Sequence, residues 1–198
     1  MDSKNPNIRM SKKRSSQKKS KKGPLFSFGR STIVLLVLAG IALTAFLAIN
    51  NAQTGEKVPI MGDISHVPEG SDPNPYNSNP PTSGIHYPED LKAGFYTENS
   101  YDYPEGYLVH NLEHGYVIFW YNCSLLSDAE CTTLKSQIQA VMDEKDGFKL
   151  IAYPWEKTDV PVVLTSWGRI LPMESFDREA ALDFIRRNLN KAPEPNAD

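Results

Sequence analysis

The residues of this chain best suited to chemistry are its four histidines, which all fall between positions 66 and 114. They are His66, His86, His110 and His114. A neutral imidazole offers a nitrogen lone pair at physiological pH, which makes histidine the commonest metal ligand. Three or four histidines from separate segments form an ordinary zinc or copper site. The cluster therefore predicts a transition-metal site.

The segment HNLEH places His110, Glu113 and His114 in close sequence. In an extended strand, residues four apart are separated by about 13 Å, too far to share an ion. In a helical turn they share one face. Gly115 can end such a turn in the left-handed conformation before the apolar run YVIFWY begins. We therefore expect a brief turn that brings both histidines together, with Glu113 as a third ligand or as a residue that orients one of them.

Two alternatives stay open for this segment. It matches the H-x-x-E-H pattern of zinc proteases, in which the glutamate acts as general base. That pattern requires a true helix, and the strand-forming residues directly after Gly115 argue against one. The histidines could instead only hydrogen-bond loop carbonyls, with Glu113 paired to Arg169. The open functions are thus a metal-binding module, a zinc-dependent hydrolase using Glu113, and a structural or partner-binding surface domain.

The charge distribution predicts a membrane anchor. Residues 1–31 carry ten Lys or Arg and one acidic residue, whereas the remainder carries 11 basic and 23 acidic residues. Between these parts, residues 32–49 contain no charge and are long enough to cross a bilayer as a helix. Lys and Arg next to a span stay on the cytoplasmic side and attract anionic lipid headgroups. We expect a single-pass plasma membrane protein with its C-terminal domain outside the cytoplasm and no nucleic-acid partner.

An uncleaved anchor is favoured over a cleaved signal peptide, because a signal peptide has a shorter apolar region and AINNAQ is a poor cleavage site. Cys123 and Cys131 would then lie in an oxidising compartment, where a short local disulfide is expected. Their spacing fits neither a CxxC motif nor a zinc knuckle.

The elements beyond the anchor must position the histidines. Residues 66–90 are rich in proline, which excludes a central strand or a regular helix. Their tyrosines and histidines favour an ordered wrapping loop over a flexible one. Strands are predicted at 116–121, 148–155 and 160–170, and helices at 127–144 and 176–189. This β-α-β-β-α order indicates an α+β two-layer sandwich, with the helices on one face of a small, largely antiparallel sheet.

Three segments resemble a known bacterial family. They are YNSNPPTSGIHYP, LVHNLEHGYVIFWY and LTSWGR, and the similarity runs roughly from Ile64 to Leu189. The family is a domain of unknown function, number 3105 in its series, whose members often have one N-terminal span. The resemblance implies no established activity. It does imply that His86, the HNLEHG segment and the SWGR segment belong to one constellation, with Arg169, Trp167 and Tyr87 as residues that support the site or the fold.

These observations predict five regions: a basic cytoplasmic tail at 1–31, a transmembrane helix at 32–49, a linker at 50–63, an extracytoplasmic domain at 64–190 and a disordered tail at 191–198. The expected function is binding of copper or zinc through His110, His114, His86, His66 and Glu113. The sequence leaves open the metal, any substrate or protein partner, and the oligomeric state.

Overall fold

The computed structural model describes residues 29–197 of the chain, which form two compact units divided after Leu47. Helix α1 (Arg30–Asn51) contains the window Thr32–Ile49, which is long and apolar enough to cross a membrane. The sequence predicted a membrane-spanning helix over these residues, and the structure shows an apolar helix of sufficient length there. A signal sequence would satisfy the same criteria of length and composition. The predicted basic tail lies mostly outside the described residues.

The second unit is built on one six-stranded sheet with the order β1-β6-β5-β3-β4-β2. The strands are β1 (Glu56–Lys57), β2 (Gly94–Phe95), β3 (Val117–Tyr121), β4 (Leu150–Pro154), β5 (Val162–Ser166) and β6 (Arg169–Met173). Strand β3 lies in the interior of the sheet. It pairs parallel with β4 and antiparallel with β5, so that Phe119 faces Ala152 on one side and Leu164 on the other.

The sheet is mixed: β1-β6, β5-β6 and β3-β5 pair antiparallel, as expected for most of the sheet, whereas β3-β4 and β2-β4 pair parallel. Helix α3 (Asp128–Glu144) connects β3 to β4 across the face of the sheet, and a crossover of this kind leaves the two strands parallel. The segment 160–170, predicted as a single strand, does not form one strand in the structure. It is the first part of a hairpin, in which β5 and β6 meet at a tight turn where Gly168 has a φ of +66°.

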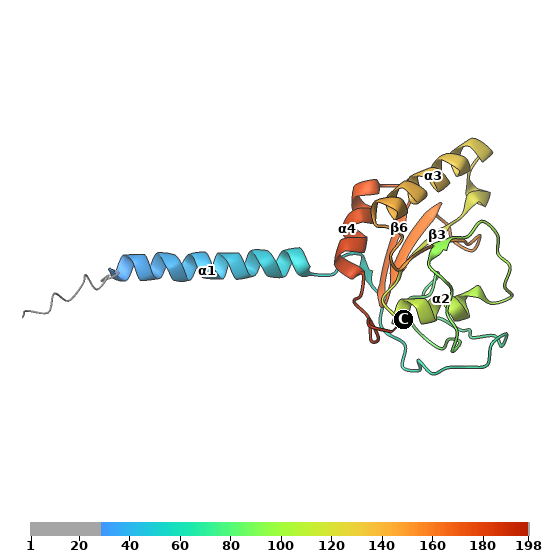
Figure 1. The fold of residues 1–198 in the computed structure, drawn as a ribbon, viewed down its shortest axis with the longest axis horizontal. Helices are drawn as coiled ribbons and strands as arrows, with labels where there is room; N and C mark the ends of the chain where they lie inside the picture. The colour runs from blue at the N-terminus through green and yellow to red at the C-terminus, as the bar shows by residue number, and fades with distance from the viewer. Residues whose placement is uncertain (1–28, 198) are drawn as a thin grey trace, which may run out of the picture. The chain divides into compact units, whose positions relative to one another are not determined.

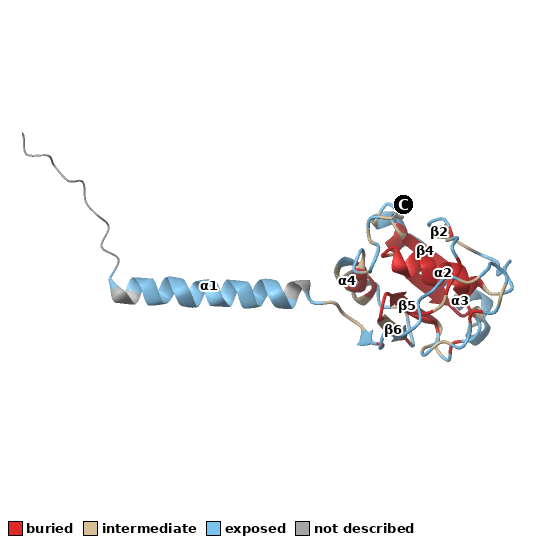
Figure 2. Ribbon diagram, turned by 90° about the horizontal axis from the view of Figure 1, so that it is seen from below, coloured by how far each residue is buried: buried red, intermediate tan, exposed pale blue. Residues whose placement is uncertain are grey.

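The sheet is covered on both faces, which makes three layers instead of the predicted two. Helices α3 and α4 (Arg178–Asn188) pack on one face, while α2 (Pro104–Glu113) packs on the other (Figure 1). Along β3, Phe119 contacts the first layer and Trp120 the second, and every residue of the strand is buried. Strand β5 is buried along its whole length as well (Figure 2). A continuous apolar strand is what burial on two faces requires.

The two long helices form as the sequence predicted. Ser127 and Glu130 form a capping box that starts α3, and each residue satisfies a backbone N–H of the other. The predicted apolar face of α3 is buried, at Leu134, Ile138, Val141 and Met142. Asp177 caps α4 by accepting a hydrogen bond from the Ala180 N–H. Capped ends of this kind account for the accuracy of both helix starts.

A disulfide between Cys123 and Cys131 joins the short 3-10 helix η1 (Cys123–Leu125) to the first turn of α3. The two Cα atoms lie 5.3 Å apart, within the usual range for a disulfide. The bond lies next to the first core layer, away from the histidines.

The proline-rich segment is held against the α2 face by side-chain hydrogen bonds. The Trp155 indole N–H donates to Asn79 Oδ1 at 2.8 Å, and the Tyr76 hydroxyl donates to the Ile85 carbonyl at 2.7 Å. The peptide bonds Asn74–Pro75 and Asn79–Pro80 are cis. His86 and Tyr87 follow directly in the chain and are both buried. These contacts place His86 beside α2.

Candidate metal centre

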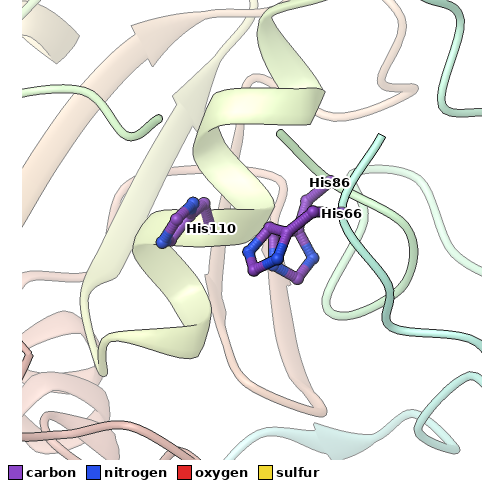
Figure 3. Close-up of side chains that lie close together, drawn as sticks. All are labelled: His66, His86 and His110. Carbon is purple, nitrogen blue, oxygen red and sulfur yellow. The ribbon is translucent and has the colours of Figure 1, made fainter. Parts of the chain in front are cut away.

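Three separate segments bring His66, His86 and His110 together. The backbones around His66 and His86 pair in parallel, through hydrogen bonds from Val67 N to His86 O (2.8 Å) and from His86 N to Ser65 O (3.3 Å). His110 comes from α2 and faces this pair (Figure 3). The site is therefore assembled from a helix and two paired loop segments.

The three imidazoles are close enough to hold one metal ion. Their ring centroids lie 4.6 Å apart for His66 and His86, and 5.2 Å for each of the other two pairs. One nitrogen from each ring lies within 4.8 Å of the other two. His86 and His110 are buried, whereas His66 is exposed. Two of the three rings are thus fixed in the interior, and the third lies on the solvent side.

The hydrogen bond of His110 to a backbone carbonyl fixes which of its two nitrogens carries the proton. Its Nδ1 lies 2.6 Å from the carbonyl oxygen of Tyr87, which can only accept, so Nδ1 carries a proton. Its Nε2 then presents a lone pair. That atom lies 2.9 Å from His114 Nε2, which can donate an N–H to it.

His86 makes an equivalent hydrogen bond to a backbone carbonyl on the other side of the cluster. Its Nδ1 lies 2.8 Å from the Gly84 carbonyl oxygen, so Nδ1 is again the donor. Its Nε2 lies 3.0 Å from the carboxylate of Glu113. Glu113 is itself 6% exposed. A lone pair and a carboxylate oxygen at this distance repel unless a proton or a cation lies between them, so this contact attracts positive charge.

His114 is the C-cap of α2 and lies between two carboxylates. Its Nδ1 is 3.8 Å from Asp90 Oδ2 and its Nε2 is 3.8 Å from Glu194 Oε2. Both distances are too long for hydrogen bonds. Within residues 29–197, the buried Nδ1 has no hydrogen-bond partner. His114 therefore lies outside the three-histidine group and contacts it only through His110.

The C-terminal segment packs against the end of α2. The backbone N–H of Glu194 donates to the Glu113 carbonyl at 3.0 Å. The Lys149 ammonium donates to the carbonyls of His114 (2.9 Å) and Pro195 (2.8 Å). Non-local hydrogen bonds therefore join Glu194 and Pro195 to the end of α2 and to Lys149.

Burial keeps the histidines on α2 neutral. It lowers the pKa of His110 below its usual value, and the neighbouring His86 and His66 lower it further, against the opposing effect of the Tyr87 carbonyl. Burial also lowers the pKa of His114, followed by the effect of His110, although Asp90 and Glu194 oppose this shift. Neutral imidazoles are the form that binds metal.

A lowered pKa in the folded state predicts acid sensitivity. In metal-free protein the unfolded chain binds protons at these histidines below about pH 6.5, whereas the folded chain does not. The stability they contribute is present above that pH and is lost as the pH falls through the folded pKa. Urea unfolding with a chelator, at about pH 7.5 and 5.5, should show a smaller pH dependence in the His110→Gln, His114→Gln double variant than in the parent. Equal pH dependence would contradict this assignment.

Gly106 allows α2 to approach the residue that holds His110. A Cβ at Gly106 would lie 2.4 Å from the ring of Tyr87, which is 1% exposed. Alanine is favoured over glycine in a helix by about 1 kcal/mol, but overpacking a fixed ring costs about 1–3 kcal/mol. Gly106→Ala should therefore lower the free energy of unfolding in urea. Gly62→Ala, where a Cβ has nothing within 4 Å, is the matched control and should leave it nearly unchanged.

The expectation of a brief turn at HNLEH was too cautious, because α2 is a ten-residue helix. Pro104 starts it, and Gly115 follows its C-cap with a φ of +85°, as predicted. The alternative pairing of Glu113 with Arg169 was wrong. Glu113 contacts His86, and Arg169 donates weakly to the Gly55 carbonyl at 3.5 Å.

The other residues that the sequence singled out, Trp167 and Tyr87, lie outside the histidine cluster or contact it through the backbone. Trp167 lies at the hairpin turn and belongs to the core layer beneath α2. Tyr87 contributes its backbone carbonyl to His110, while its hydroxyl donates to the Ser71 carbonyl. Sequence reasoning missed Asp90 and Glu194. Asp90 lies four residues after His86, which was a usable signal, but nothing local to Glu194 pointed to His114.

A family model described as a protein of unknown function (DUF3105) matches residues 66–198. The matched region begins at His66 and includes every residue of the cluster described above. No curated protein and no solved structure matches the chain. The match extends over most of the chain, and its region coincides with the similarity noted in the sequence. This protein belongs to the DUF3105 family.

Proposed function

We propose that this protein is a membrane-anchored, extracytoplasmic domain that binds a transition metal, copper or zinc, through His66, His86 and His110. The observation that carries the proposal is the convergence of three imidazole nitrogens within 4.8 Å from three separate segments. Nitrogen-only ligand sets of this kind suit zinc and copper. His114 and Glu113 each contact one of these ligands and complete the surroundings of the ion.

Proton counting supports a cation at this site. His110 and His86 each donate Nδ1–H to a carbonyl, so both expose Nε2. The Nε2 of His86 faces the Glu113 carboxylate, whereas the Nε2 of His110 faces the Nε2 of His114, which can donate an N–H to it. Carbonyl-bound imidazoles with an outward nitrogen are the usual arrangement of metal-ligating histidines. A metal ion would satisfy these lone pairs without added protons.

The three histidine nitrogens must move closer together to bind one metal ion. Ligand nitrogens around a tetrahedral zinc ion lie about 3.4 Å apart, given Zn–N distances near 2.1 Å. Bringing a spacing of up to 4.8 Å to that value needs movement of about 1 Å or more, by the same geometry. The exposed ring of His66 is the member that can move at least cost, because His86 and His110 are buried.

Two features support our proposal that the domain lies outside the cytoplasm, namely the candidate membrane helix and the disulfide. The candidate span precedes the domain, and the basic residues before it favour retention on the cytoplasmic side. The Cys123–Cys131 disulfide suits an oxidising compartment. These features support a ligand-binding domain that residues 32–49 anchor at the extracytoplasmic surface of the membrane.

The direct test is metal content. Full-length chain purified in detergent without a histidine tag, and reconstituted with zinc or copper, should hold near-stoichiometric metal by mass spectrometry. The His86→Ala, His110→Ala double variant should hold none. Absence of metal from both proteins after reconstitution would instead favour the structural or partner-binding function.

A zinc-dependent hydrolase is the second candidate, and the length of α2 favours it. The H-x-x-E-H pattern lies on a true helix and its C-cap, although the two Nε2 atoms, 2.9 Å apart, would have to separate by about 0.5 Å to bind one tetrahedral zinc ion. Against it, the Glu113 carboxylate contacts His86, whereas a general base must reach a water. Turnover of an ester and peptide panel by the zinc-loaded parent, lost in Glu113→Gln with zinc retained, is the expected result for a hydrolase; no turnover by the parent would exclude these substrates.

A further inference from the structure

A polar cavity lies between the proline-rich segment and the start of α2. Its volume is about 210 Å³. Its lining includes Asn74, Tyr76, Asn79, Glu105, Trp155 and Lys157. None of these residues belongs to the histidine cluster, so the cavity has a chemistry of its own.

Glu105 is a buried carboxylate with one unsatisfied oxygen. The residue is 2% exposed. Its Oε1 accepts a hydrogen bond from Asn74 Nδ2 at 3.2 Å, but its Oε2 has no partner among the residues that the structure describes. A buried polar atom without a partner is costly. The cavity therefore offers a strong acceptor to a ligand that donates.

The chain already places one ammonium group at the mouth of this cavity. Lys157 Nζ lies 4.3 Å from the ring centroid of Trp155 and 3.7 Å from Glu105 Oε1. The indole is held in place by its N–H, which donates to Asn79. An aromatic face beside a carboxylate is the usual recognition site for an organic cation. The Lys157 side chain is 62% exposed, so it can leave without disturbing buried structure.

We propose that this cavity binds a small organic ammonium ion, which takes the place of the Lys157 ammonium over Trp155 and donates to Glu105. The positive charge matches the buried carboxylate, and the apolar part of the ligand packs on the indole. The volume is below the 300–1,000 Å³ of typical ligand sites, which limits the ligand to a short-chain amine or the side chain of a lysine. The Lys157 ammonium competes with the ligand for the position over Trp155.

The test is calorimetric titration of the full chain in detergent with n-butylammonium, which reproduces the lysine side chain. Lys157→Ala should bind it at least tenfold more tightly than the parent, because the competing ammonium is gone. Neutral n-butanol should not bind. Adding Glu105→Gln to the Lys157→Ala variant should abolish binding while the melting curve is retained.

A blocked lysine, Nα-acetyl-lysine methylamide, distinguishes the two sources of the ammonium. Equal binding of both probes would assign the cavity to a lysine side chain, and binding of n-butylammonium alone to a free amine. Failure of Lys157→Ala to bind n-butylammonium, or equal binding of n-butanol, would overturn the proposal. That comparison needs only the Lys157→Ala variant, so it holds even where the Glu105 variant fails to fold.

Discussion

A free zinc or copper concentration one hundred times the dissociation constant is expected to raise the free energy of unfolding by about 2.7 kcal/mol. An ion held by His66, His86 and His110 binds only the folded chain, because these ligands come from three segments that converge on folding. For a domain of this size the increase corresponds to a rise in melting temperature of about 8 °C. Melting of the full chain, followed by circular dichroism with and without metal, measures it.

The matched variants isolate the metal-dependent part of this shift. His86→Ala, His110→Ala should melt at the same temperature with and without metal, whatever its stability without the ion. Glu98→Ala removes an exposed acidic side chain and should keep the full shift. A parent protein whose melting curves coincide with and without saturating metal would sink the metal-binding proposal, since native-state binding must stabilise.

Glu113→Ala is expected to lower the free energy of unfolding of the metal-free protein by about 3 kcal/mol, because it removes one partner of a buried charged contact. His86 is fully buried, and its Nε2 has the Glu113 carboxylate at 3.0 Å. The variant removes the carboxylate that shares a proton with this nitrogen in the metal-free protein. Urea unfolding with a chelator measures the loss, and Glu98→Ala should change stability by less than about 0.5 kcal/mol.

A double-mutant cycle tests whether the cost comes from this contact. His86→Ala combined with Glu113→Ala should cost less than the sum of the two single changes, because the second removes an interaction that the first already broke. Strict additivity would mean that the two side chains stabilise the fold independently. This cycle is run without metal, so its result stands apart from the metal experiment.

Much of the local structure followed from the sequence. The charge-free window at 32–49 predicted the apolar helix α1, because length and polarity are properties of one segment. The capping residue Ser127 and the apolar spacing predicted α3. Gly115 predicted the end of α2, because its left-handed conformation excludes most other residues. The grouping of all four histidines in one region was also visible.

Only the tertiary structure decided how these pieces meet. The length of α2 was underestimated because its packing against the sheet outweighs the weak local preference of a segment followed by strand formers. The parallel pairing of β3 with β4 depends on which edge the chain returns to. The pairing of Glu113 with His86, and the approach of Glu194 to His114, join residues far apart in sequence. Residue types and spacing determine which groups are available for chemistry, whereas long-range burial and hydrogen bonding determine which of them share a site.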